Sequence, residues 1–126
     1  MIAAPPLAVS GFVVERVNGT RKNVPPGGSA PLCRAIFVSA IEVRLRARLG
    51  RSSSTRAVLV ATYPGHVVRR HRLRLHPRRG ITRVLLHGAD ERLPSGGFTA
   101  GAYRFTVSAA GRRAGAKLTL TGATTC

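Results

Sequence analysis

The chain has 126 residues, the length of one domain and enough to bury an independent hydrophobic core. Hydrophobic residues make up 44% of it, which is typical of a folded chain, and no apolar run approaches the roughly 20 residues of a membrane-spanning helix, so no membrane span is expected. Lysine and arginine number 21 against 4 acidic residues, so the formal net charge is +17 and polyanions must be considered as partners.

The positive charge is almost entirely arginine, because Lys22 and Lys117 are the only lysines. Two explanations fit this composition. The arginines can serve a polyanionic partner, or a GC-rich coding bias can produce them without any ligand, since net charge reports on association and not on fold. Composition alone leaves both explanations open.

The beginning of the chain predicts residues 1–8 as an N-terminal tether, followed by a single domain over residues 9–126. It lacks the charged and apolar regions of a signal peptide, and this absence does not decide the compartment. A first strand is expected over residues 9–17, where β-branched and aromatic side chains alternate only weakly. Residues 18–31 are rich in Gly, Pro and Asn and predict a loop.

The longest periodic segment runs over residues 33–49. Every second position from Cys33 to Leu49 is apolar or small, and in the second half of the segment Glu42, Arg44, Arg46 and Arg48 lie between these positions. A helical stripe through Ile36 and Val43 is an alternative, but the strict alternation in the second half of the segment and its β-branched content favour a strand. We therefore expect one long strand with Cys33 on its inward row.

Three further strands are expected before the last quarter of the chain. Residues 57–63 form a short apolar run that suits a buried strand, and residues 81–86 form another. Residues 66–76 alternate but are polar on both faces in their first half. Charged residues on an exposed edge discourage pairing with other molecules, so this segment is predicted to lie at the edge of a sheet.

The last quarter of the chain predicts a hairpin. Tyr103, Phe105 and Val107 alternate with polar residues, and residues 116–121 alternate in the same way after a turn at Gly111. Gly101 supplies a backbone that is free to adopt a positive φ before the first of these strands. The whole pattern predicts an all-β chain, a two-sheet β-sandwich of about seven antiparallel strands.

The two cysteines are Cys33 and the last residue, Cys126. A disulfide between them would close nearly the whole domain, at about 4 to 5 kcal/mol in the chain-entropy model. A buried free thiol at Cys33 is one alternative. A bond from Cys126 to another chain is the other.

The residues needed for catalysis or metal binding do not form a site in the sequence. The four histidines have no metal-ligand spacing, and no Gly-x-Ser-x-Gly nucleophile motif is present. Glu15, Glu42, Asp90 and Glu91 are the only carboxylates. We therefore expect no enzyme activity, no metal, no cofactor and no small-molecule substrate.

Two rows of arginines are the strongest candidates for a binding site. Arginines in each row recur at every second residue, about 6.6 Å apart in a strand, so each row could bind phosphate, sulfate or carboxylate groups. The candidate partner-binding residues are Arg44, Arg46 and Arg48 in the first row, with Arg69, Arg70, Arg72 and Arg74 around the second. If both strands present one face, they form a cationic plate. The absence of Trp favours contact with a polymer backbone or a glycan over base stacking.

A family resemblance is carried by small residues in the second half of the chain: Gly80, Val84-Leu85-Leu86, Gly88, Leu93-Pro94, Ala100 to Phe105 and Ala109 to Gly111. This pattern resembles bacterial immunoglobulin-like domains, including those of flagellar hook-capping proteins and actinobacterial surface proteins. The hook-capping pattern has Trp-Asp-Gly before its Leu-Pro, where this chain has Leu86-His87-Gly88. The resemblance implies an immunoglobulin-like or fibronectin III-like sandwich and an extracellular or cell-surface location.

Two functions are compatible with these observations. The first is a non-catalytic structural or interaction module of a secreted, cell-surface or filament assembly, with a protein partner or self-assembly. The second is a module that binds nucleic acid or an anionic glycan through its arginine rows.

Overall fold

The computed structural model describes residues 5–33, 37–49, 54–76 and 80–122 of the chain. All regular structure in these ranges is β-strand, so the prediction of an all-β fold is confirmed. Among these residues no helix is long and apolar enough to cross a membrane.

The described residues form nine strands, two more than the seven expected. Their bounds are β1 Leu7–Arg16, β2 Arg21–Val24, β3 Ser29–Pro31, β4 Val38–Ala47, β5 Thr55–Tyr63, β6 Val67–Leu75, β7 Ile81–His87, β8 Gly101–Ala109 and β9 Arg112–Thr121.

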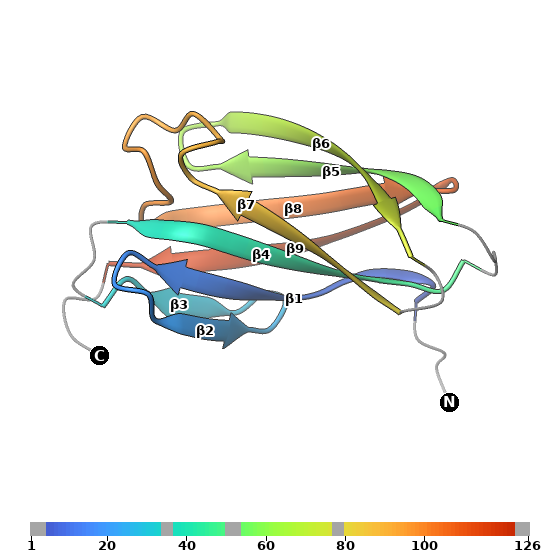
Figure 1. Ribbon diagram of the computed structural model, residues 1–126, viewed down its shortest axis with the longest axis horizontal. Coiled ribbons are helices and arrows are strands. Elements are labelled where there is room, and N and C mark those ends of the chain that lie inside the picture. The colour runs from blue at the N-terminus through green and yellow to red at the C-terminus, as the bar shows by residue number, and fades with distance from the viewer. Residues whose placement is uncertain (1–4, 34–36, 50–53, 77–79, 123–126) are drawn as a thin grey trace.

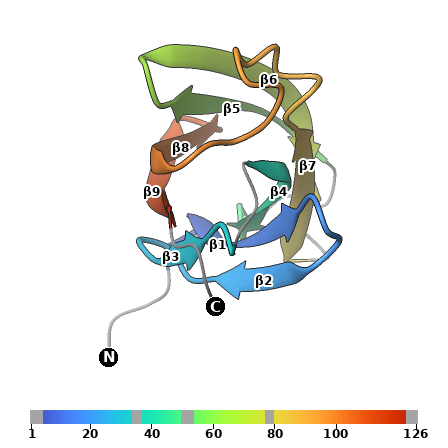
Figure 2. The same ribbon diagram turned by 90° about the vertical axis from the view of Figure 1, so that its left-hand side faces the viewer.

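The strands form two sheets that pack face to face as two layers, as Figures 1 and 2 show. The first sheet has four strands in the order β2-β1-β4-β7, and the second has five strands in the order β3-β9-β8-β5-β6. Neighbouring strands are antiparallel except β3 and β9, which are parallel. Because β6 has a partner on one side only, the prediction that residues 66–76 lie at a sheet edge is confirmed.

Strand β1 shows why its alternation is weak in the sequence. The pairing of β1 with β4 shifts by one residue between Val9 and Gly11, which is a β-bulge. Leu7 and Val9 face the core before the bulge, and Phe12 and Val14 face it afterwards. One extra residue thus changes the parity of the inward row, and a strict period of two cannot describe the whole strand.

The core lies between the two sheets and includes five aromatic rings. Tyr63 packs edge-on against Phe98, Tyr103 and Phe105, with ring centroids 5.4, 5.7 and 6.4 Å away, and Phe12 contacts Phe105 from the opposite sheet at 5.2 Å. The predicted inward row of Tyr103, Phe105 and Val107 is fully buried. The hairpin of the last quarter is therefore a central part of the core.

Two local predictions were wrong. Residues 18–31, expected to be a loop, contain β2 and β3, because backbone pairing with β1 and β9 makes strands of segments too short to show a periodicity. Cys33 does not open the long strand, since β4 begins at Val38, and Cys33 instead lies in a turn after β3 with a φ of 53°. Cys126 lies outside the described residues, so its disulfide with Cys33 stays a prediction.

Candidate polyanion-binding face

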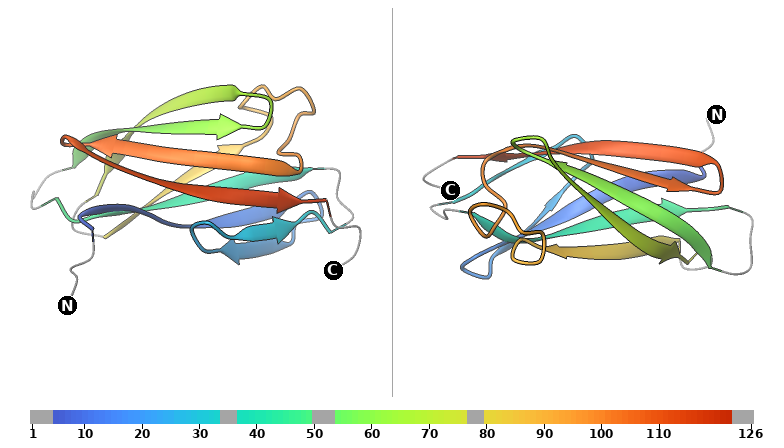
Figure 3. Two further views of the ribbon diagram at one scale, coloured as in Figure 1. Left: turned by 180° about the vertical axis from the view of Figure 1, so that it is seen from behind. Right: turned by 90° about the horizontal axis from the view of Figure 1, so that it is seen from above.

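The outer face of the five-stranded sheet carries a dense set of cations. Residues paired directly across antiparallel strands point to the same side of a sheet, and the partners here alternate with the buried row of each strand. The exposed cations on this outer side are Arg70, Arg72 and Arg74 of β6, Arg56 of β5, Arg104 of β8, and Arg113 and Lys117 of β9. We call these seven residues the cationic face. Figure 3 (left) views the molecule from the side of this sheet.

None of the four carboxylates of the chain lies on the cationic face, and all four are within the described residues. Glu15 and Glu42 pair with neighbours on the outer side of the four-stranded sheet. Asp90 and Glu91 belong to the connection between β7 and β8. The seven cations therefore have no acidic side chain among them to neutralise their charge.

Two pairs of cations stand directly opposite each other on this face. Arg56 is the cross-strand partner of Arg74, and Arg104 is the partner of Lys117. Like charges directly opposite on neighbouring strands destabilise a sheet. An anion bound above either pair would remove that repulsion, so the sheet itself favours an anionic partner at these positions.

The cations are arranged as two rows with an uncharged floor between them. One row runs along β6 and the other runs along β9, and Arg56 of β5 and Arg104 of β8 lie at the two ends of the floor. The rows are three strand spacings apart, about 14 Å. The floor between them consists of short side chains: Val58, Val60 and Thr62 of β5, and Thr106 and Ser108 of β8.

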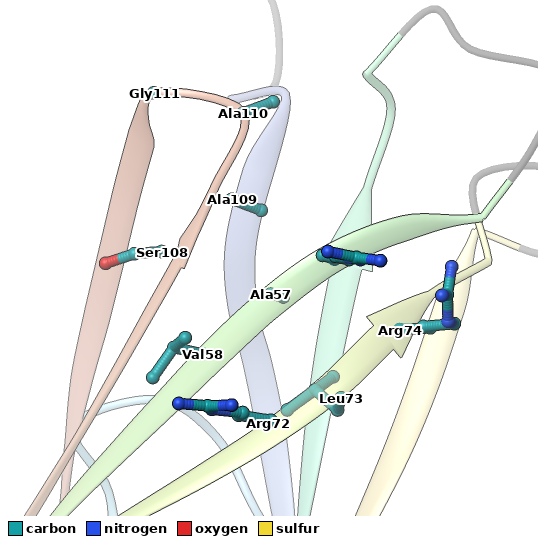
Figure 4. A pocket seen from close by; sticks show the side chains of 10 residues that line it. Ala57, Val58, Arg72, Leu73, Arg74, Ser108, Ala109, Ala110 and Gly111 are labelled. Carbon is teal, nitrogen blue, oxygen red and sulfur yellow. The ribbon is translucent and has the colours of Figure 1, made fainter.

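A shallow hollow of about 680 Å³ lies at the end of the face nearest the β8–β9 turn (Figure 4). Its lining includes Arg56, Arg72, Arg74, Ser108 and Gly111. Figure 4 shows Val58 between Arg72 and Ser108, so the arginine from the edge strand lies beside a small polar and apolar surface. Arginines from β5 and β6 thus line this hollow together with the hydroxyl-bearing Ser108 of β8.

The structure separates the two predicted arginine rows. Arg70, Arg72 and Arg74 lie on the cationic face, but Arg44 and Arg46 point outward from the four-stranded sheet, on the opposite side of the molecule. The two rows therefore do not form one plate. The sequence shows the alternation within each strand but not which sheet each strand joins.

The first row also differs from the second in its surroundings. The Nε of Arg44 donates a hydrogen bond to Oε2 of Glu42 at 3.1 Å, so a carboxylate partly neutralises this row. Arg48 lies beyond the end of β4, where its backbone N–H donates to the carbonyl of Pro6 at 2.7 Å. This row is a weaker candidate for binding an anion than the row on β6.

Arg69 lies on the inward row of β6 and has a structural role. Its Nε donates a hydrogen bond to the backbone carbonyl of Glu91 at 2.8 Å, and its Nη2 donates to the carbonyl of Arg92 at 3.4 Å. These bonds hold the β7–β8 connection against the edge strand. The Arg69 guanidinium group is therefore engaged in hydrogen bonds within the protein, and Arg69 does not belong to the cationic face.

A buried carboxylate, which the sequence did not reveal, fixes the same connection. Oε1 of Glu91 accepts a hydrogen bond from the hydroxyl of Tyr63 and is 2.7 Å from Nε2 of His71. Glu91 is only 4% exposed. Burial, the hydrogen bond to Glu91 and its negative charge all raise the pKa of Tyr63 well above its ordinary value.

Four members of the cationic face were not among the predicted site residues: Arg56, Arg104, Arg113 and Lys117. The alternation of the last hairpin already placed Arg104 and Lys117 on the side opposite the core. What the sequence did not show was that this side continues across β5 onto β6. Sheet pairing, and not local pattern, brings the seven cations together.

The described residues include no group of three or more His, Cys, Asp or Glu side chains placed to hold a metal ion. Comparison of the chain with protein-family models and with curated proteins finds no match.

Proposed function

We propose that this protein is a non-catalytic binding module that holds a polyanion against the cationic face of its five-stranded sheet. The observation that carries the proposal is the set of seven exposed cations on one outer face with no carboxylate among them. Arginine suits this role because its planar guanidinium group binds phosphate, sulfate and carboxylate groups through two parallel hydrogen bonds.

We also propose that the fold belongs to the immunoglobulin-like class. In that class strands A, B and E form part of one sheet, and strands G, F and C form the other. The orders β1-β4-β7 and β9-β8-β5 are consistent with this arrangement, and the chain passes between the sheets at β2–β3, β3–β4, β4–β5, β6–β7 and β7–β8. Such domains act through their surfaces, and an extracellular or cell-surface location is part of this proposal.

Codon bias does not account for where the arginines lie. A bias toward arginine codons acts on the whole chain and explains the total charge. The electrostatic potential of a face depends on where the charges lie and on whether carboxylates accompany them. Here the cross-strand pair of Arg56 and Arg74 has no acidic neighbour on its face, whereas Arg44 has Glu42.

The test compares two triple variants that remove three charges each. Arg70→Ser/Arg72→Ser/Arg74→Ser changes the cationic face, and Arg44→Ser/Arg46→Ser/Arg48→Ser changes the four-stranded sheet and the end of β4. We expect the natural protein to bind heparin and inorganic polyphosphate at about 0.1 M NaCl and to release both as salt rises. The first variant should lose most of this binding, and the second should keep most of it.

Two results would overturn the proposal. One is no binding to either polyanion at about 0.1 M NaCl. The other is an equal loss of binding in both variants, which would show that net charge alone, and not the cationic face, attracts the polymer. Circular dichroism of each variant checks that the sheets remain folded.

A second candidate function is a structural module of an assembly, with a protein partner or a second copy. Edge strand β7 favours it, because Ile81 and Leu85 on its outer side are 40% and 51% exposed and its free edge can pair with another strand. Concentration-dependent oligomers in sedimentation experiments without any polyanion would support this function. A strictly monomeric profile would count against self-assembly.

A further inference from the structure

The two cation rows and the floor between them define the polyanion more closely. We propose that the cationic face binds the two phosphate backbones of double-stranded DNA without reading its base sequence. This inference rests on the proposed function, because it requires that the face bind a polyanion at all.

The cationic face lacks a surface on which bases could stack. Proteins that bind single-stranded nucleic acid combine a positively charged groove with aromatic side chains on which the bases stack. No aromatic residue lies on the outer face of β5, β6, β8 or β9. Tyr63, Tyr103 and Phe105 of these strands are all buried in the core. The face therefore offers unpaired bases nothing to stack on and favours a ligand that presents its backbone.

The separation of the two cation rows is close to the distance between the two backbones of a duplex. Along the direction of strand pairing the rows on β6 and β9 are about 14 Å apart, and the twist of the sheet inclines one row to the other (Figure 3). In B-form DNA the two backbones that border the minor groove are about 6 Å apart at their surfaces, which places their phosphate centres about 12 Å apart. Flexible arginine and lysine side chains can cover the remaining difference. A duplex can thus touch both rows at once, with its groove above the uncharged floor.

The charge density of the cationic face can be compared with that of a DNA duplex. From the pair Arg56 and Arg74 to the pair Arg104 and Lys117 the face spans three steps of two residues, about 20 Å along the strands. Seven cations in this length give about one charge per 3 Å. Duplex DNA carries one charge per about 1.7 Å of its axis, of which only part faces any one side. The two densities are comparable.

The floor explains why binding would be independent of base sequence. Its side chains are valine, threonine and serine, which are shorter than the arginines and lysine on either side. Reading a base edge needs a side chain or an element that enters a groove. The outer face is formed only by strands of the sheet, so phosphates are contacted and base edges are not.

The experiment measures the affinity of the full chain for labelled probes as a function of NaCl concentration. The probes are two duplex DNAs of equal length and unrelated sequence, one single strand of the same length, and heparin as a competitor. We expect the two duplexes to bind within about twofold of each other and the single strand to bind more weakly. The slope of log K against log salt reports the number of phosphates neutralised, at about 0.9 per contact for a duplex.

The matched variants test whether the contacts counted by this slope come from the cationic face. Arg70→Ser/Arg72→Ser/Arg74→Ser removes three contacts and should reduce the magnitude of the slope by about 2.7, whereas Arg44→Ser/Arg46→Ser/Arg48→Ser should leave it nearly unchanged. If the first variant does not fold, Arg104→Ser/Lys117→Ser tests the other row and should reduce the slope by about 1.8.

The outcomes separate this inference from the proposed function. Binding of heparin without binding of duplex DNA overturns the inference and leaves the proposed function intact. Tighter binding of the single strand than of the duplex also overturns the inference. Failure to bind heparin, polyphosphate and DNA overturns both.

Discussion

The carboxylate of Glu91 is a single buried acceptor that joins three parts of the molecule. It lies in the β7–β8 connection and contacts Tyr63 of β5 and His71 of β6. A buried polar group that loses its partner costs about 1 to 3 kcal/mol. This one residue therefore holds a long connection to the edge of the five-stranded sheet.

Glu91→Gln tests this role. The amide keeps the size of the side chain but removes the charge that Tyr63 and His71 contact, so we expect the free energy of unfolding to fall by about 1 to 3 kcal/mol. Urea unfolding followed by circular dichroism measures the change. Asp90→Asn is the matched control, because it makes the same change of charge at an exposed neighbour and should alter stability by less than about 0.5 kcal/mol. Equal effects of the two substitutions would contradict the structural role of Glu91.

The buried tyrosines make stability depend on alkaline pH. Burial raises the pKa of Tyr103 from 10.0 to about 12, and the pKa of Tyr63 is also raised. The folded state thus keeps both phenols protonated at pH values where the unfolded chain has ionised them. The resulting stability is fully present below pH 10 and is lost as the pH rises from 10 toward 12.

The expected loss approaches about 2.7 kcal/mol per pH unit in this range, since each phenol contributes about 1.36 kcal/mol. Urea unfolding at several pH values between 10 and 12, with tyrosinate absorbance followed in parallel, measures it. Tyr103→Phe should reduce the slope by about half. A slope unchanged by this substitution would show that other groups govern alkaline unfolding.

Strand β8 begins at a glycine whose backbone no other residue adopts easily. Gly101 has a φ of 148°, and a Cβ at this position would lie 2.6 Å from Cγ of Pro64. The sequence indicated that Gly101 is free to adopt a positive φ, and its φ in the structure is positive. The contact with the turn after β5 is an additional constraint that the sequence did not show.

Gly101→Ala should therefore destabilise the fold by about 1 to 3 kcal/mol, through backbone strain and the clash with Pro64. Thermal and urea unfolding of the variant measure the loss. Gly122→Ala is the control, because a Cβ there meets only Ala100 at an ordinary contact distance of 4.0 Å. A stable Gly101→Ala variant would mean that the start of β8 can shift without affecting the core.

The long strands could be predicted from the sequence, and the short strands could not. The long strands carry enough alternating residues to be found from sequence, as for β4, β5 and β8. Strands β2 and β3 have only four and three residues and lie in a segment rich in Gly and Pro, so no local pattern marks them. Their pairing depends on backbone contacts with β1 and β9, and β9 is distant in sequence.

The candidate site was predictable only in part for the same reason. The alternation along β6 correctly grouped Arg70, Arg72 and Arg74, and the alternation of Arg44 and Arg46 was equally clear. Which of these rows shares a face with further cations depends on the order of strands in each sheet. Neither that order nor the buried position of Glu91 can be obtained from local periodicity.

At the scale of the whole molecule, the net charge of +17 opposes compactness. The folded state holds these charges closer together than the unfolded chain does. Salt shortens the range of this repulsion, since the Debye length falls from about 30 Å at 0.01 M to about 8 Å at 0.15 M ionic strength. The folded state should therefore gain stability from added salt.

The prediction is that the free energy of unfolding rises when NaCl increases from about 0.01 M to about 0.15 M. Urea unfolding at the two concentrations measures the rise. The variant Arg70→Ser/Arg72→Ser/Arg74→Ser has a net charge of 17 − 3 = +14 and should show a smaller rise. A decrease of stability with NaCl would mean that attractive ion pairs outweigh the repulsion.

The absence of carboxylates from the cationic face also affects how the protein is handled. The chain contains no Trp and only two Tyr, so its own ultraviolet absorbance is weak. Nucleic acid from the expression host, carried along on this face, would dominate the spectrum of a purified sample and enlarge its apparent size in gel filtration. A high-salt wash before any measurement of concentration or oligomeric state would separate the protein from this nucleic acid.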